Sequence, residues 1–406
     1  MKVKIIAIGL LVITTAIVGF YPGIESSGSN ITTTVTVPGV NTSIVDPFAN
    51  PQPVIEAVFV LDTTGSMSGL IDAAKEKIWS IASTMAMAQQ APEIRIGLVG
   101  YRDRGDRYVT SITDLSSDLD SVYATLMDFQ ADGGGDGPES VNQALYDAVH
   151  KISWSQVDDA YRVVFLIGDA PPHMDYQDDV KYPDTLNVAN SKGITVNAIQ
   201  AGKNNQTHYQ WLQIAQLGMG SYFQVEQAGN AVAIATPFDE ELAMLSRKLD
   251  DTKLYYGSIE TRAKQAAKAA TTEKALASAS PASRARRAAF NASDSGKINF
   301  RGDAELVDDI ASGLVDLASI DKDELPAPLQ ALAPEEQEVL IKETIVERNE
   351  MQQKIRQLAE VRSSYLKEQV DALGGAEDSL DHKLFDAMRD QAGKKGIIYS
   401  QEEPEY

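Results

Sequence analysis

Apolar residues fall into two alternating patterns between Val54 and about Asp250. Short unbroken apolar runs have the length of buried strands, and the segments between them repeat apolar residues every three or four positions, as on one face of a helix. This alternation predicts an α/β fold with a Rossmann-like, doubly wound and mainly parallel sheet over residues 54–250. The runs expected to form strands are 57–61, 94–101, 163–167, 194–199 and 222–225, with 108–112 as a short edge strand. The segments expected to form helices are 71–85, 119–129, 141–152 and one that begins near Pro237.

Residues 334–396 have the pattern of a C-terminal α-helical region. The segment 334–373 is apolar along one side and rich in charged residues elsewhere, and Gly374-Gly375 ends it before a second short helix at 380–388. Strict heptads place Arg348 and Arg362 at core positions, which argues against a simple coiled coil. An αα-hairpin that packs on the preceding domain or on another chain fits this pattern.

Residues 251–333 lie between these two regions and combine an alanine-rich basic linker with a mixed segment. From Arg262 to Ser293 the chain carries seven basic residues and a single acidic one, Glu273. We expect a solvated helix or linker here. The alternative is a docking segment for anionic lipid or for the acidic body of the protein itself.

The first twenty residues combine Lys2 and Lys4 with an uncharged apolar stretch from Ile5 to Phe20. This pattern is that of a signal peptide or an N-terminal membrane anchor. A clear small-residue cleavage site is missing, so we expect an uncleaved anchor, followed by a flexible tether at 21–53. The expected location is the cell envelope, anchored in the inner membrane and facing the periplasm or the exterior, or secreted if the segment is cleaved.

Composition excludes several kinds of function. The 406 residues carry a net charge of -22, which argues against nucleic acid as a partner because phosphate binding requires a basic surface. There is no cysteine, so disulfides, thiolate metal sites and cysteine nucleophiles are excluded. Four histidines are too few to favour a histidine-rich zinc site.

Oxygen-bearing side chains follow two of the expected strands at the point where each strand ends. Asp62 ends the first run and precedes Thr64 and Ser66, and Asp169 follows the strand at 163–167. Ligands of open α/β sheets bind at the carboxyl ends of the strands, so these oxygens are expected to converge. Oxygen ligands suit a hard divalent cation, Mg²⁺ first, with Mn²⁺ or Ca²⁺ as alternatives. The simpler interpretation is that Asp62 and Ser66 cap the helix that begins near Ser68.

A glycine-rich loop precedes the helix expected at 141–152. Gly133, Gly134 and Gly135 allow the backbone to pass close to a ligand, and Asp136 follows them. Pro138 suits the first turn of a helix, and Glu139 suits the positive end of its dipole. A plain flexible turn is the alternative, but the helix start directly after the glycines favours a positioned loop.

The Asp62-x-Thr64-x-Ser66 arrangement, together with Asp169, resembles the metal-ion-dependent adhesion site of the von Willebrand factor type A (vWA) family. The blocks 100–106 and 168–173 are similar to those of a bacterial subgroup of exported vWA proteins. The resemblance implies that Asp62, Thr64, Ser66 and Asp169 hold the metal, and that a loop threonine completes the site. That threonine is absent here, and Asp136 is its nearest replacement. The added charge of Asp136 is expected to tighten ion binding and to weaken attraction for an acidic ligand.

The resemblance implies a binding protein without catalytic residues, in which the metal captures a carboxylate of a protein partner in adhesion or assembly. One alternative is a metal-dependent phosphohydrolase that uses Asp62. That chemistry requires an acid/base residue two positions later, where Thr64 stands, and a neutral hydroxyl cannot carry the proton. Another alternative is a structural envelope protein that acts through its helical tail. His173, beside Asp169, is expected to pack in the loop because no nucleophile with a base partner is apparent.

Overall fold

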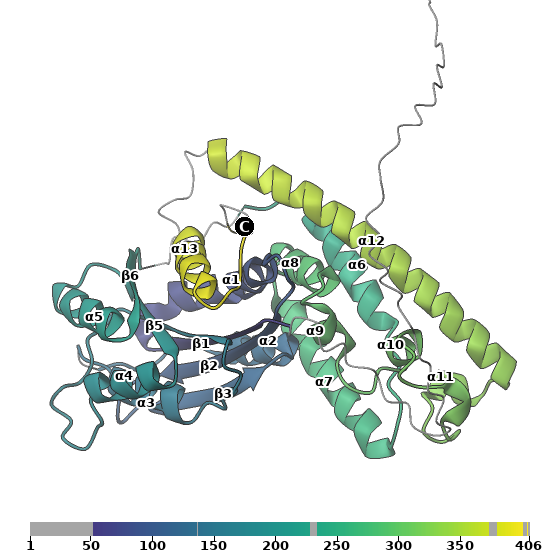
Figure 1. The fold of residues 1–406 in the computed structure, drawn as a ribbon, viewed down its shortest axis with the longest axis horizontal. Helices are drawn as coiled ribbons and strands as arrows, with labels where there is room; N and C mark the ends of the chain where they lie inside the picture. Colours follow the sequence, from purple (N-terminus) through teal and green to yellow (C-terminus); the bar gives the residue numbers. More distant parts are fainter. Residues whose placement is uncertain (1–51, 136, 228–233, 373–379, 401–403, 405–406) are drawn as a thin grey trace, which may run out of the picture. The chain divides into compact units, whose positions relative to one another are not determined.

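The computed structural model describes residues 52–135, 137–227, 234–372, 380–400 and 404. Its centre is a six-stranded sheet in the order β3-β2-β1-β4-β5-β6, in which only β3 runs antiparallel to its neighbour (Figure 1). The strands are β1 (Val54–Asp62), β2 (Glu93–Tyr101), β3 (Thr110–Ser116), β4 (Tyr161–Gly168), β5 (Ile194–Ala201) and β6 (Met219–Val225). The predicted doubly wound α/β fold is confirmed, with β3 at one edge as expected.

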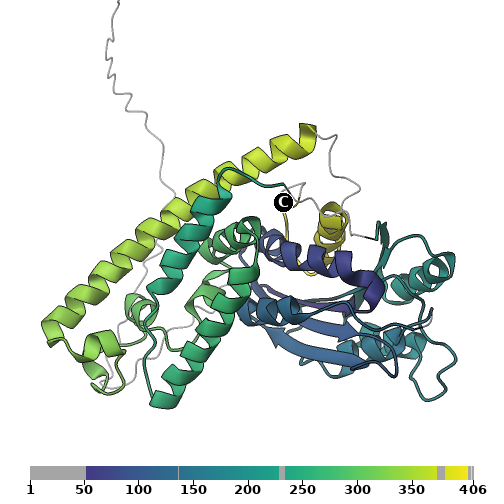
Figure 2. The same cartoon turned by 180° about the vertical axis from the view of Figure 1, so that it is seen from behind.

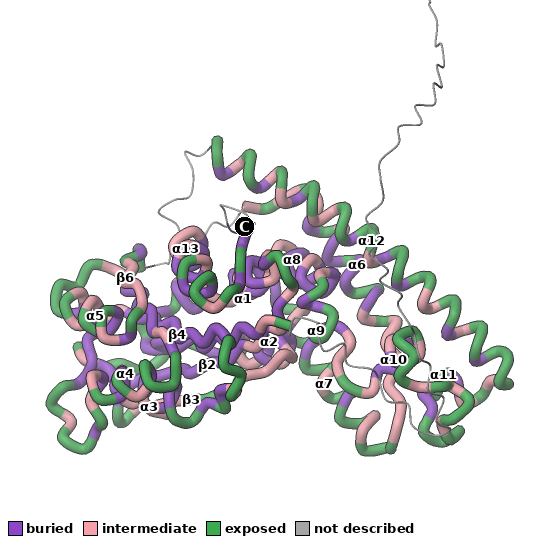
Figure 3. Tube along the Cα trace, viewed as in Figure 1, coloured by how far each residue is buried: buried purple, intermediate pink, exposed green. Residues whose placement is uncertain are grey.

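Helices cover both faces of the sheet because successive residues of its buried strands point to opposite sides. On β1, Phe59 and Leu61 pack into one core, and Val58 and Val60 pack into the other. The first core is covered by α1 (Ser68–Ala86), α2 (Leu119–Asp128) and α13 (Leu380–Gly393). The second is covered by α3 (Val141–His150), α4 (Tyr182–Ser191) and α5 (Asn205–Leu217). Figure 3 shows the resulting band of buried strands between the two layers.

The C-terminal helical region is also confirmed, and its arrangement explains two arginines at apolar positions. Helix α12 (Pro334–Ala372) packs against α6 (Asp239–Asp251) and α8 (Pro281–Ala292). Arg348 and Arg362 of α12 are each only 2 % exposed. Arg348 binds both carboxylate oxygens of Glu305 at 2.8 Å, and the Nε of Arg362 donates to Asp239 at 2.8 Å. Both arginines therefore occupy core positions as members of buried ion pairs, and not as coiled-coil contacts.

Four more short elements and one long helix lie between β6 and α12 in the chain, together with α6 and α8. The long helix is α7 (Ile259–Ser278). The short ones are α9 (Lys297–Arg301), α10 (Leu306–Ala311), a 3-10 turn at Leu317–Ser319 and α11 (Ala327–Gln330). Figure 1 labels α9, α10 and α11, and Figure 2 shows the molecule from behind. Basic residues of α7 and α8 differ in their surroundings, because Lys264 of α7 is exposed whereas Arg286 and Arg287 of α8 are buried.

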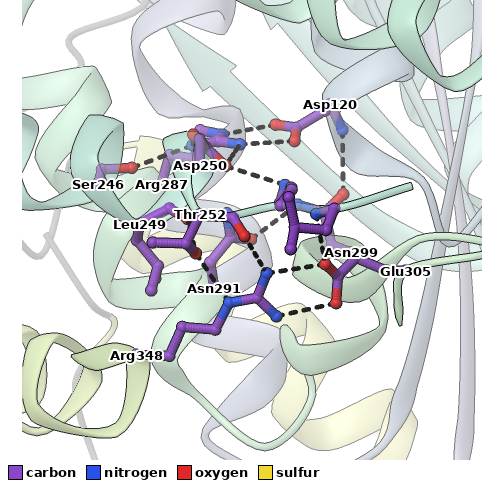
Figure 4. Close-up of polar contacts among 12 residues, drawn as sticks. Asp120, Ser246, Leu249, Asp250, Thr252, Arg287, Asn291, Asn299, Glu305 and Arg348 are labelled. Atoms are coloured by element: carbon purple, nitrogen blue, oxygen red, sulfur yellow. Dashed lines mark hydrogen bonds and ion pairs between the residues drawn. The ribbon is translucent and has the colours of Figure 1, made fainter. Parts of the chain in front are cut away.

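Arg287 joins the helical region to the sheet domain. Its guanidinium is held by Asp120 of α2, at 2.6 and 2.7 Å, and by Asp250 of α6, at 2.7 and 3.2 Å (Figure 4). Ser246 accepts a further hydrogen bond from it at 3.0 Å. The five N–H donors of the guanidinium are therefore all hydrogen-bonded, and the side chain is 1 % exposed. Through Arg287, the basic segment 262–293 therefore docks on acidic groups of the protein itself.

Helix α13 returns to the sheet domain and packs on α1 and β6. Lys77 of α1 and Asp381 of α13 form a buried ion pair at 3.1 Å. Gln391 and Asn197 of β5 exchange two amide hydrogen bonds, at 2.8 and 3.1 Å. The C-terminal helix therefore completes the layer that covers the first core.

The predicted signal peptide or anchor at 1–20 lies outside the described residues, as does nearly all of the tether predicted at 21–53. Export and membrane anchoring stay predictions. Within the part of the chain that the structure describes, no helix is both long and apolar enough to cross a membrane.

Replacing Arg287 by Ala is predicted to destabilise the protein strongly, because Asp120, which is 4 % exposed, would keep a buried charge without its partner. The expected loss is about 3–5 kcal/mol of unfolding free energy, measured by urea denaturation. Arg247→Ala is the matched control, since Arg247 is 76 % exposed and pairs with Glu273 at 3.6 Å. The control is expected to lose under about 1 kcal/mol. Equal losses in the two variants would contradict this role of Arg287.

The Arg287 pair also predicts a pH dependence. Burial alone would raise the pKa of Asp250, but Arg287 and Lys253 outweigh it and lower that pKa from 3.8 to about 2. The unfolded chain therefore binds more protons between pH 4 and 2, so this stabilisation is present above pH 4 and lost as the pH falls to 2. Asp250→Asn should reduce the fall in unfolding free energy across this window by about 2 kcal/mol, measured by urea denaturation at each pH. An unchanged fall would refute the assignment.

Candidate functional site

Two acidic residues meet at the carboxyl edge of the sheet because β1 and β4 are parallel neighbours. Leu61 of β1 pairs with Ile167 of β4, so Asp62 lies beside Gly168 and the following Asp169. Gly168 is required here, since a Cβ at this position would lie 3.0 Å from the Cβ of Asp62 and closer still to the hydroxyl of Tyr101. The pairing predicted from the two strand ends is present.

Asp62 is fully buried and forms a tight turn with Thr64. Its Oδ1 accepts hydrogen bonds from the backbone N–H of Thr64 at 2.9 Å and from the Thr64 hydroxyl at 2.6 Å. Its Oδ2 is buried and has no hydrogen-bond partner among the described residues. Burial raises the pKa of Asp62 to about 7, the hydrogen bonds from Thr64 oppose that rise, and the charge of Asp169 adds to it.

Ser66 and Asp169 lie nearer to solvent and share a neighbour that the sequence did not single out. Ser66 is exposed in the 3-10 turn Gly65–Met67, and Asp169 is half-buried. The amide Nε2 of Gln227, which follows β6, donates to Asp169 Oδ2 at 2.6 Å and to the carbonyl of Ser66 at 3.2 Å. Gln227 thus connects the two loops, although a lone glutamine two residues after a strand gives no sequence signal for this.

The glycine-rich loop lies directly against the Asp62–Ser66 segment. Gly65 donates its backbone N–H to the carbonyl of Gly133 at 3.2 Å. Gly133 and Gly134 have φ values of +78° and +79°, which favour glycine. A Cβ on Gly134 would lie 3.2 Å from the Cβ of Thr64. The loop therefore packs against the first motif, and its expected approach to a ligand stays a prediction, while Asp136 itself lies outside the described residues.

Glu139 is a member of the acidic cluster that the sequence interpretation missed. We expected it to complement the dipole of α3, but it is 3 % exposed and its Oε2 has no hydrogen-bond partner in the described part of the chain. Burial raises the pKa of Glu139 to about 9, and Asp62, Asp103, Asp106 and Asp169 add to the rise. Its position directly after the glycine-rich loop is the signal that could have identified it.

Tyr101 lies close to the same group of acidic residues. It ends β2 beside Asp62 and is completely buried. Burial raises the pKa of its phenol well above the usual value, and the charges of Asp62, Glu139 and Asp169 raise it further. Asp62, Glu139 and Asp169 therefore act on one another electrostatically within a buried edge of the sheet.

A second set of polar residues holds the loops around this cluster. Arg102 donates to the Thr63 hydroxyl at 3.3 Å and to the carbonyl of Gln130 at 2.8 Å, which ties the first motif to the start of the glycine-rich loop. Asp103 accepts hydrogen bonds from Ser140 and Tyr176, each at 2.8 Å.

His173 belongs to this supporting set. Its ring stacks on Tyr176 with centroids 3.9 Å apart, and its Nε2 lies 3.4 Å from Asp103 Oδ2. The Nδ1 of His173 lies 2.8 Å from Asp175. These contacts agree with the loop-packing role expected from the sequence.

The donor set fits a hard divalent cation that keeps water ligands. No group of three His, Asp or Glu side chains among the described residues is arranged to hold a metal by itself. Mg²⁺ does not require such a cage, because it is usually bound through one or two carboxylates and several waters. The Oδ2 of Asp62 and the Thr64 hydroxyl are ligands of the required chemistry. Gly134 packs closely on the Cβ side of Thr64.

Comparison with known proteins agrees with this geometry. Residues 56–236 match the family model of the von Willebrand factor A domain. An ariadne-like RING finger protein of Acanthamoeba polyphaga mimivirus is 27% identical over 122 residues, which cover 30% of this chain and 12% of that protein. The alpha-protein kinase vwkA of Dictyostelium discoideum is 28% identical over 122 residues, covering 29% and 19% respectively. The chain thus spans less than a fifth of either relative.

Solved structures with similar segments share little sequence with this chain. Proximal thread matrix protein 1 from the mussel byssus aligns over 43% of this chain and 42% of its own, with 12% identity and a TM-score of 0.33. The SpRpn10 VWA domain aligns over 43% and 88%, with 11% identity and a TM-score of 0.33. The matched segment, residues 56–236, contains nearly the whole six-stranded sheet and its carboxyl edge, and the match indicates a von Willebrand factor A domain in this part of the chain.

Proposed function

We propose that the vWA domain binds a divalent cation, Mg²⁺ first, and captures a protein partner through it. The observation that carries the proposal is the buried Asp62 Oδ2, which has no hydrogen-bond partner in the described structure. A buried carboxylate oxygen without a partner is costly, and a cation would compensate it. Thr64 would supply a hydroxyl ligand, and Ser66 and Asp169 would contribute directly or through water. The vWA domain itself favours a role in protein–protein interaction.

A partner carboxylate suits the open coordination positions of such an ion. The cation would be held by few protein ligands on the exposed side, where Ser66 is exposed and Asp169 is half-buried. Glu139 lies on the buried side, and its raised pKa favours the protonated acid when no ion is bound. A bound cation would favour the charged form of Glu139, which would then offset part of the positive charge of the ion. The site is therefore expected to bind its ion firmly and to attract acidic groups moderately, as proposed for Asp136.

A binding role accounts for the described residues better than hydrolysis does. A phosphohydrolase would need a proton carrier where Thr64 stands, and the Thr64 hydroxyl is already donated to Asp62. Ser140 donates to Asp103 and not to His173, so these residues do not form a nucleophile with its base. We therefore propose adhesion or assembly as the role, without catalysis.

Replacing Asp62 by Asn is predicted to remove Mg²⁺ binding while preserving the shape of the side chain. Calorimetric titration should show one site in the wild type and a loss of at least about 100-fold in affinity in the variant, which corresponds to about 2.7 kcal/mol. Asp72→Asn is the matched control, because Asp72 is exposed on α1 and its only described ion pair is at 3.9 Å to Lys75. Unchanged titration of the Asp62 variant would exclude this site.

A second prediction concerns the carboxyl groups of Glu139 and Asp136. Glu139→Gln removes a carboxyl group that a bound cation would deprotonate, and Asp136→Thr removes a carboxylate. Each variant should therefore weaken Mg²⁺ binding and strengthen capture of an acidic peptide, if that residue faces the ion. Affinity for Mg²⁺ and for a set of acidic peptides is measured for both variants with Mg²⁺ present. We expect both changes for both variants. If Mg²⁺ affinity does not fall in either variant, neither carboxylate acts on the ion.

A further inference from the structure

A cavity of about 500 Å³ lies outside the vWA site, among the C-terminal helices. It is lined by α6, α7, α8 and α9, with Asp120 of α2 at one side. Pockets that hold small molecules commonly have volumes of about 300–1,000 Å³ and lie where domains meet. Apart from Asp120, its lining residues follow the segment that matches the vWA domain. The cavity is therefore a feature of the helical region of this chain.

One wall of the cavity is apolar and is made largely of small side chains. The helix α7 contributes Ala266, Ala269, Ala270 and Ala277, which share one face of the helix. Phe300 and Leu276 supply the larger apolar surfaces, and Phe300 is 3 % exposed. Because alanines stand where larger residues would fill the space, an apolar ligand body can lie against α7.

The rest of the lining is largely polar and includes six Lys and Arg residues and four Asp and Glu residues, in a chain whose net charge is -22. Most of these charges already have partners. Arg287 binds Asp120 and Asp250, as Figure 4 shows, and Lys268 pairs with Asp118 at 2.7 Å. The cationic balance of the lining favours an anionic ligand over a cationic one.

Among the basic residues that line the cavity, Arg284 of α8 differs in having no ion-pair partner in the described part of the chain. The Arg284 side chain is half-buried. A carboxylate, sulfonate or phosphate oxygen in the cavity would give its guanidinium a charged hydrogen-bond partner.

We propose that this cavity binds a small amphipathic anion. Its apolar body would lie against Phe300, Leu276 and the alanines of α7, and its anionic group would accept a hydrogen bond from Arg284. A fatty carboxylate and an alkyl phosphate share this chemistry. Binding here is independent of the cation site at Asp62, which lies at the carboxyl edge of the sheet.

The chain has no cysteine, so a single introduced one can carry a local probe. Ala267 and Ala270 are both exposed on α7, but only Ala270 lines the cavity. Ala270→Cys therefore places a trifluoromethyl label at the cavity, and Ala267→Cys places the same label on a part of α7 that does not line it. The full chain is titrated with octanoate, octyl phosphate and octylammonium, and the ¹⁹F signal is followed by NMR. We expect saturable shifts at position 270 with the two anions, at most a tenth of that affinity for octylammonium, and no saturable shift at position 267.

Arg284→Gln tests the proposed contact in the labelled Ala270→Cys chain. The loss of a charged hydrogen bond should lower the affinity for octanoate at least about tenfold, and Arg284→Lys should restore part of it. A preference for one anion over the other identifies the head group. Equal binding of octylammonium, saturation at position 267 as well, no shift at position 270, or unchanged affinity in Arg284→Gln would each overturn the proposal.

Discussion

The carboxyl edge of the sheet depends on one electrostatic constraint, the burial of Asp62 at the end of a central strand. Parallel pairing of β1 with β4 brings Asp169 beside it, and the loop before α3 adds Glu139. Backbone and hydroxyl donors of Thr64 satisfy only one of the two Asp62 oxygens. The close packing around Asp62 and Thr64 also requires small residues, since a side chain at Gly168 would collide with Asp62 and one at Gly134 would crowd Thr64.

A comparable constraint governs the helical region, where buried arginines replace apolar contacts. Arg287, Arg348 and Arg362 are each at most 2 % exposed, and each is bound to a carboxylate from another element. Such pairs add little net stability over apolar packing, but breaking one leaves a buried charge. They therefore fix which helices pack together. Helix α1, which follows the Asp62–Ser66 segment, is joined in the same way to α13 by Lys77 and Asp381.

Local patterns were sufficient to predict the fold because strands and helices differ in their apolar periodicity. The long helix α12 and most strands of the sheet lie close to their expected ranges, whereas β3 (Thr110–Ser116) begins two residues later and ends four residues later than the edge strand expected at 108–112. Helices α4 and α5 were not identified individually, since their few buried residues lie among many polar ones. The partner of Arg287 could not be predicted either, because Asp120 is 167 residues away in the chain.

The candidate site was predictable to the extent that strand ends determine it. Asp62, Thr64 and Asp169 follow from the ends of β1 and β4, which parallel pairing brings together. The inward position of Glu139 depends on how its loop packs against Pro171 and His173, and the contact of Gln227 depends on where β6 ends. Both are tertiary effects that a residue pattern does not contain.

The most direct test of the cation site is anomalous diffraction from crystals of the protein grown with Mn²⁺. The account predicts one strong anomalous peak bonded to Asp62 Oδ2, at roughly 2.0–2.2 Å as for octahedral hard cations, with Thr64, Ser66 or Asp169 as further ligands or water-linked neighbours. A crystal in which Mn²⁺ is bound elsewhere, and Asp62 Oδ2 keeps no metal at saturating Mn²⁺, would contradict it.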